Sequence, residues 1–187
     1  REMTPYDEDE LPEGNLYQIE NGKIEIIAGE TEQTDQVIWD YFVELFPANI
    51  HKNIVQYLVY QGDDDTMAFV TQLEEGKNDK WVMAVNTNDE MFRSDGSIKN
   101  LKDLRQTLIH EFIHVMTLND SQVNTNIDED DCYPSFYTDE GCTNKNSFIN
   151  LFVKKFWKRK DLEGVLEDEE YGIDLYDRQP KGFVSDY

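Results

Sequence analysis

Polar and apolar residues alternate near the start of the chain, in two runs within residues 16–27 that lie on either side of Asn21-Gly22. Asn-Gly between alternating runs is the strongest short-range signal for a β-hairpin. Three later runs, over residues 54–60, 66–73 and 80–86, are rich in β-branched and aromatic residues and predict strands. Acidic or Gly-bearing turns interrupt these runs, which is typical of an antiparallel or mixed sheet.

Other segments repeat their apolar residues at helical spacing. The first predicts a helix over residues 35–46, capped by Thr34 or Asp35 and stopped by Pro47. A longer helix is predicted over residues 101–118, with Asn100 as its N-cap. A third, amphipathic helix is predicted over residues 146–159, and residues 162–187 give no firm element. The expected buried face of the long helix comprises Leu101, Leu104, Leu108, Phe112 and Val115.

Composition indicates one folded domain. Residues 1–15 are acidic, contain two prolines and are expected to form an arm, and residues 16–187 are expected to form a single domain. The net charge of −23 argues against partners that need a basic footprint, such as nucleic acid or an anionic membrane surface. It favours a basic partner, or simply keeps the protein soluble. No apolar run of about 18 residues is present, so no transmembrane segment is predicted.

The acidic residues gather in runs that are typical of solvated loops. One of these runs, at residues 128–131, leaves open the question of adventitious calcium binding.

Two of the three histidines lie four residues apart in the long predicted helix. At 3.6 residues per turn, His110 and His114 project from one face and can reach one tetrahedral zinc ion. Glu111 lies beside the first ligand, where it can take a proton from zinc-bound water and return it to a leaving amine. This spacing indicates the zinc-binding and general-base half of a metallopeptidase site. The alternative is a pair of helix histidines satisfied by neighbouring side chains.

The third zinc ligand is less evident. His51, the remaining histidine, precedes a predicted strand and is expected to lie on the surface. A carboxylate should therefore complete a set of two histidines and one acid. Glu163, Glu167 and Glu170 lie in a loosely helical stretch and are the candidates within the chain.

Several segments together resemble a group of bacterial zinc metallopeptidases that are gluzincin-like and often exported as lipoproteins. They are residues 107–114, 81–86, 141–150 and the final Gly182-Phe183-Val184-Ser185-Asp186-Tyr187. The resemblance implies an α+β, zincin-like fold with a twisted mixed sheet, a backing helix, an active-site helix and a mainly helical C-terminal part. It also implies a further helix after Tyr187 that supplies the glutamate ligand, so the expected third ligand lies beyond this chain. On this interpretation the 187-residue form lacks that helix, binds zinc weakly and is nearly or wholly inactive.

In zincin architecture the strand at the edge of the cleft pairs with an extended substrate. The strand that precedes the active helix is the candidate here, although it could equally be an ordinary interior strand. Its predicted substrate-binding residues are Trp81, Val82, Met83, Ala84 and Val85.

The two cysteines, Cys132 and Cys142, lie in a polar, turn-rich stretch. In an exported protein they would form one disulfide that closes a short loop, whereas in a reducing compartment they would be free thiols. The resemblance favours an extracellular or cell-surface protein of a bacterium, with a possible lipid anchor upstream of Arg1.

The sequence therefore predicts a zinc-dependent peptide hydrolase that acts on peptides or proteins. One alternative is a catalytically silent zincin-fold module whose acidic surface binds a basic partner. Another is a zinc hydrolase that acts on a non-peptide amide, for instance in cell-wall material. The oligomeric state and the cleavage specificity do not follow from the sequence.

Overall fold

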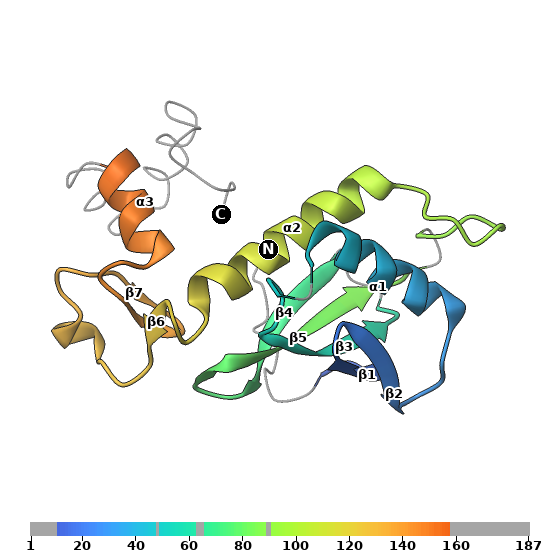
Figure 1. The fold of residues 1–187 in the computed structure, drawn as a ribbon, viewed down its shortest axis with the longest axis horizontal. Helices are drawn as coiled ribbons and strands as arrows, with labels where there is room; N and C mark the ends of the chain where they lie inside the picture. The colour runs from blue at the N-terminus through green and yellow to red at the C-terminus, as the bar shows by residue number, and fades with distance from the viewer. Residues whose placement is uncertain (1–10, 48, 63–65, 89–90, 158–187) are drawn as a thin grey trace. The chain divides into compact units, whose positions relative to one another are not determined.

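A computed structural model describes residues 11–47, 49–62, 66–88 and 91–157. The chain divides into two compact units, residues 1–119 and 120–187, and each is described by itself. The first unit contains a five-stranded mixed sheet in the order β2-β1-β3-β5-β4, together with helices α1 and α2 (Figure 1). This confirms the expected α+β class and mixed sheet. The single domain over residues 16–187 stays a prediction.

The predicted hairpin is confirmed as strands β1 (Gly14–Glu20) and β2 (Lys23–Ala28). Asn21 and Gly22 both have positive φ, 52° and 77°, which is the backbone of the tight turn that Asn-Gly favours. Strand β1 begins within the segment expected to be an arm, because Gly14 pairs with Tyr60 of β3. Residues 1–10 of that arm lie outside the described residues.

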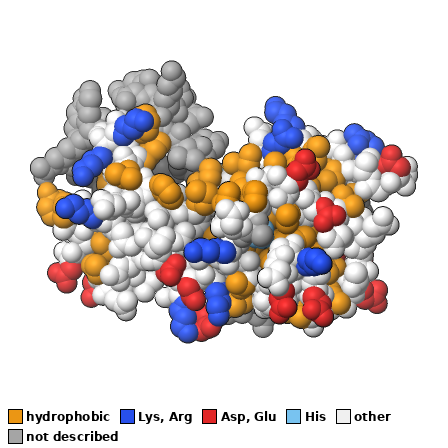
Figure 2. Space-filling model, viewed as in Figure 1, with side chains coloured by type: hydrophobic (Ala, Val, Ile, Leu, Met, Phe, Trp, Pro, Cys, Tyr) orange, Lys and Arg blue, Asp and Glu red, His pale blue; other side chains and the backbone are white. Residues whose placement is uncertain are grey.

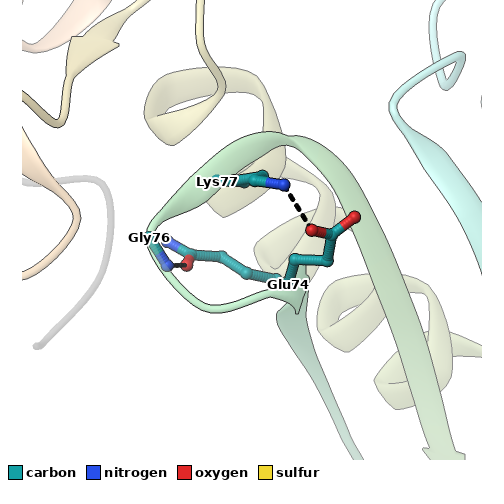
Figure 3. Close-up of polar contacts among 4 residues, drawn as sticks. Glu74, Gly76 and Lys77 are labelled. Carbon is teal, nitrogen blue, oxygen red and sulfur yellow. Dashed lines mark hydrogen bonds and ion pairs between the residues drawn. The ribbon is translucent and has the colours of Figure 1, made fainter.

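Strands β3 (Ile54–Tyr60), β4 (Ala68–Glu74) and β5 (Lys77–Asn86) complete the sheet. β3 pairs with β5 in parallel, and β4 pairs with β5 antiparallel. The β4–β5 connection is tight: Gln72 accepts a hydrogen bond from the backbone N–H of Gly76, and Lys77 pairs with Glu74 (Figure 3). Among the described strands, β4 therefore occupies one edge of the sheet and β5 lies inside it.

Helix α1 (Gln33–Leu45) begins two residues earlier than predicted. Its N-cap is Glu32, so Thr34 and Asp35 lie in the first turn and the predicted cap is wrong. Asp35 is instead buried and accepts hydrogen bonds from the hydroxyl of Tyr17 at 2.7 Å and the amide of Asn15 at 3.0 Å. Burial raises the pKa of Tyr17 to about 12, and the hydrogen bond that its hydroxyl donates to Asp35 is the second cause of this rise. These contacts hold the start of α1 against β1.

The main core lies between one face of the sheet and the two helices. On that face, the ring of Tyr57 lies 5.3 Å from Trp39 of α1 and 5.8 Å from Tyr17 of β1. The helices meet each other through Phe46 and Phe112, whose ring centroids are 4.2 Å apart. Helix α2 (Leu101–Leu118) packs against β4 and β5.

A second apolar cluster occupies the opposite face of the sheet. It comprises Leu58, Tyr60, Val82 and Ala84, with Leu16, Phe69 and Leu73 packed against it.

His51 is buried, and the expectation of a surface histidine is wrong. Its side chain is 2% exposed and lies edge-on to Trp39 and Phe42, with ring centroids 5.6 and 5.4 Å away. Neither ring nitrogen has a hydrogen-bond partner within the part of the chain that the structure describes. Burial lowers the pKa of His51, because the charged imidazolium would lose its hydration among these aromatic rings.

This burial predicts a loss of stability in acid. The unfolded chain takes up a proton at His51 near pH 6.5, while the native state resists it, so the free energy of unfolding falls as the pH drops below about 6.5. Replacing His51 with Phe should remove this component of the pH dependence, while the contribution of the half-buried His114 remains. Urea titrations of both proteins between pH 5 and pH 8 measure the difference. Parallel curves for the two proteins would contradict the prediction.

The second unit is built around a small sheet and helix α3 (Phe148–Phe156). The short strands β6 (Val123–Asn124), β7 (Tyr137–Thr138) and β8 (Gly141–Thr143) pair in the order β6-β8-β7, and a 3₁₀ turn covers Glu129–Asp131. Ser147 caps α3, and the Asn150 side-chain amide donates to the backbone oxygen of Asn144 at 2.8 Å. The described helix is shorter than the predicted span of residues 146–159, and residues 158–187 lie outside the described residues.

Cys132 and Cys142 form a disulfide with their Cα atoms 5.5 Å apart. The disulfide confirms the predicted pairing rather than the alternative of free thiols. The acidic residues 128–131 are exposed, as expected of a solvated run, and calcium binding there stays a prediction. None of the helices within the described ranges is long and apolar enough to cross a membrane.

Candidate metal centre

The helix that carries the histidine pair has the predicted bounds and cap. The side chain of Asn100 accepts a hydrogen bond from the backbone N–H of Asp103, which satisfies one of the free donors at the start of α2. The buried residues of the helix are Leu104, Leu108, Phe112, Val115 and Leu118. Leu101, predicted to be buried, is 42% exposed because it lies at the very start of the helix. The remaining positions of α2 are half-buried or exposed, and His110, Glu111 and His114 are half-buried.

The two imidazoles point toward each other. Nε2 of His114 lies 3.0 Å from Nε2 of His110, and the ring planes are inclined by 72°. Two nitrogens bound to one tetrahedral zinc at 2.0–2.1 Å lie about 3.3 Å apart. The pair therefore already has nearly the spacing that one zinc ion needs, and it fits two positions of a zinc ligand set.

The electrostatic setting of the pair also suits metal binding. Burial lowers the pKa of His114, and the neighbouring His110 lowers it further. A histidine must be neutral to bind zinc, since the proton and the metal compete for the same nitrogen. The environment therefore favours the form of His114 that can act as a ligand near neutral pH.

Glu111 lies between the two histidines in sequence. The pKa of its carboxyl is raised to about 7. Burial causes the rise, and a hydrogen bond from the backbone N–H of Val70 offsets part of it. Among the described residues Glu111 forms no ion pair. A carboxyl whose pKa lies near neutrality can both accept and return a proton at physiological pH, which is what a general base that also acts as an acid requires.

The predicted substrate strand is not at the edge of the sheet. Residues 81–85 lie in β5, whose backbone is paired with β3 on one side and with β4 on the other. Their side chains are at most 2% exposed. They therefore form an interior strand, which was the alternative interpretation, because β5 enters the sheet between β3 and β4. The residues concerned are Trp81, Val82, Met83, Ala84 and Val85.

The strand beside the histidine pair is β4 instead. It is an edge strand among the described residues, and α2 packs against it. Val70 of this strand faces Glu111, a contact that was not predicted. No local pattern in residues 68–74 reveals this role, because the position of a strand in a sheet depends on its pairing with distant segments.

Among the described residues, no group of three or more His, Cys, Asp or Glu side chains is placed to hold a metal, so the structure identifies no third ligand there. Glu163, Glu167 and Glu170 lie outside the described ranges, so their candidacy stays a prediction. The same holds for a ligand beyond Tyr187. The described part of the chain thus brings together the two predicted ligands and the predicted general base.

Comparison with known proteins returns no match to any family model, to any curated protein or to any solved structure.

Proposed function

We propose that this chain carries the centre of a zinc-dependent peptide hydrolase. His110 and His114 would hold the metal, Glu111 would handle the proton, and a carboxylate in residues 163–170 or beyond Tyr187 would complete the ligand set. The observation that supports this most is the convergence of two imidazoles, with their Nε2 atoms 3.0 Å apart, beside a half-buried carboxyl that forms no ion pair with a described residue.

A zinc ion held there would supply Lewis acidity for the scissile carbonyl and lower the pKa of a bound water toward about 7. Glu111 would accept a proton from that water and deliver it to the leaving amine. The burial that raises the pKa of Glu111 makes the first transfer easier, because a more basic carboxylate accepts a proton more readily.

The edge strand β4 supports a peptide as the substrate. Backbone groups on the free side of an edge strand can pair with an extended chain, and this mode of recognition does not depend on the side chains of the ligand. The strand lies against α2, so a peptide paired with it would run past Glu111. We propose β4 in place of residues 81–85 as the strand that binds the substrate.

A second candidate is a silent zincin-fold module that binds a basic partner through an acidic surface. On the face in Figure 2, acidic and basic side chains of the described residues are interspersed and form no continuous acidic area. A half-buried carboxyl with a pKa of about 7 is also costly to keep ionised, and a silent module has no use for it. These observations favour the hydrolase over the module.

The disulfide supports a location outside the reducing cytoplasm, since such bonds persist in oxidising compartments. We therefore propose an exported bacterial protein, with a lipid anchor as one means of attachment to the cell surface.

Activity assays on the full-length protein test the proposal. We expect casein or a peptide library to be cleaved, cleavage to stop with 1,10-phenanthroline, and zinc to restore it. Turnover of isolated cell-wall fragments without cleavage of peptides would instead select the non-peptide amide hydrolase. Tight zinc binding without turnover of either substrate would select the silent module and refute the peptide hydrolase.

A further inference from the structure

The hydrogen-bonding pattern of β4 determines which of its backbone groups are free. The backbone N–H of Asn86 donates to the oxygen of Met67 at 2.9 Å, and the register pairs Phe69 with Ala84 and Thr71 with Val82. In an antiparallel pair, hydrogen-bonded and non-hydrogen-bonded positions alternate. Residues 67, 69 and 71 therefore bond to β5, whereas Val70 directs its N–H and C=O away from β5, to the free side of the strand.

Helix α2 runs along that strand. The hydroxyl of Thr107 lies 3.5 Å from the sulfur of Met67. Glu111 is one helical turn beyond Thr107 on the same face of the helix, and Val70 is three residues beyond Met67. The helix and strand thus run side by side in the same direction, and the carboxyl of Glu111 faces the outward N–H of Val70.

We propose that the backbone amide of Val70 is the positioning group for Glu111. A carboxylate on a side chain with several rotatable bonds has many rotamers, and few of them would place an oxygen beside a metal held by His110 and His114. A donor fixed in a sheet restrains one oxygen and leaves the other for the proton. Val70 acts through Glu111, so it is a positioning residue and not a catalytic one.

Amide hydrogen exchange tests this placement without any turnover. In wild-type protein the Val70 amide should be protected although β5 does not bond to it. Glu111→Ala removes the acceptor and should accelerate its exchange at least about tenfold, while Glu111→Gln, which keeps an acceptor oxygen, should give an intermediate rate. The amides of Phe69 and Thr71, which bond to β5, serve as internal controls and should not change. Equal Val70 exchange rates in wild type and Glu111→Ala would overturn the proposal.

Steady-state kinetics test the consequence of the contact between Val70 and Glu111 for catalysis. Val70→Pro removes the N–H at a position where proline leaves the β4–β5 hydrogen bonds intact. In the full-length protein it should lower kcat by about 10- to 100-fold with a smaller change in KM, and Val70→Ala, which retains the amide, should lose much less. Equal losses in the two variants would show a packing role and overturn the positioning role. Should Val70→Pro not fold, the exchange experiment decides alone.

The kinetic experiment on the Val70 variants rests on the proposed function, whereas the hydrogen-exchange experiment does not. Accelerated exchange in Glu111→Ala together with a wild-type protein that cleaves no substrate would refute the hydrolase and keep the contact. Active enzyme with an unprotected Val70 amide would keep the hydrolase and refute the positioning role.

Discussion

Replacement of Glu111 by Gln is expected to lower kcat/KM of the full-length protein by about 100-fold or more, with zinc affinity changed only a few-fold. The amide has the shape of the carboxylate but cannot take a proton from water at neutral pH, so the proton transfer, which general-base catalysis assists by about 10²–10⁴-fold, is lost. Initial rates on a fluorogenic peptide identified from the library, beside a zinc titration, measure both quantities.

The exposed Glu44 on α1 offers a matched control. Glu44→Gln makes the same chemical change at an exposed position on another helix and should leave both the rate and the zinc affinity unaltered. If Glu111→Gln kept more than about a tenth of the wild-type activity, another group would have to be the base.

The same substitution has an expected effect on stability. The folded-state pKa of Glu111, about 7, lies above the value near 4.5 of an exposed carboxyl, so the native metal-free protein holds a proton that the unfolded chain releases. The free energy of unfolding therefore falls as the pH rises from about 4.5 to about 7. Metal-free Glu111→Gln should unfold at a higher urea concentration than wild type at pH 8, and at a similar concentration at pH 4.

Removal of either histidine of the pair is expected to weaken zinc binding to the full-length protein by at least about 100-fold. Each imidazole fills one of the few ligand positions on the metal, and the remaining donors cannot replace it without moving the helix. Competition with a chromophoric chelator measures the dissociation constants of His110→Ala and His114→Ala.

The third histidine provides the control for this experiment. His51 is buried beneath α1 against Trp39 and Phe42, so His51→Phe should leave zinc affinity unaltered. Zinc affinity within a few-fold of wild type in both His110→Ala and His114→Ala would contradict a shared metal site, whatever the activity of the protein.

The elements predicted most accurately are those whose cause is local. The bounds of α2 follow from Asn100 as a cap and from an apolar stripe at helical spacing, both of which lie within the helix itself. The turn at Asn21-Gly22 is likewise specified by two residues that tolerate positive φ. The start of α1 was misplaced for the opposite reason: Asp35 has the side chain of a cap, but Tyr17 and Asn15 of a distant strand take up its carboxyl.

The sequence by itself determined the centre of the candidate site, because the spacing of His110 and His114 within one helix decides which way both rings project. Tertiary structure alone decided what surrounds that centre. Parallel pairing of β3 with β5 moved residues 81–85 into the interior and left β4 at the edge, where Val70 meets Glu111. Packing of α1 over β3 buried His51. Strand order and burial are set by contacts between residues far apart in the chain, and no pattern within a single segment records them.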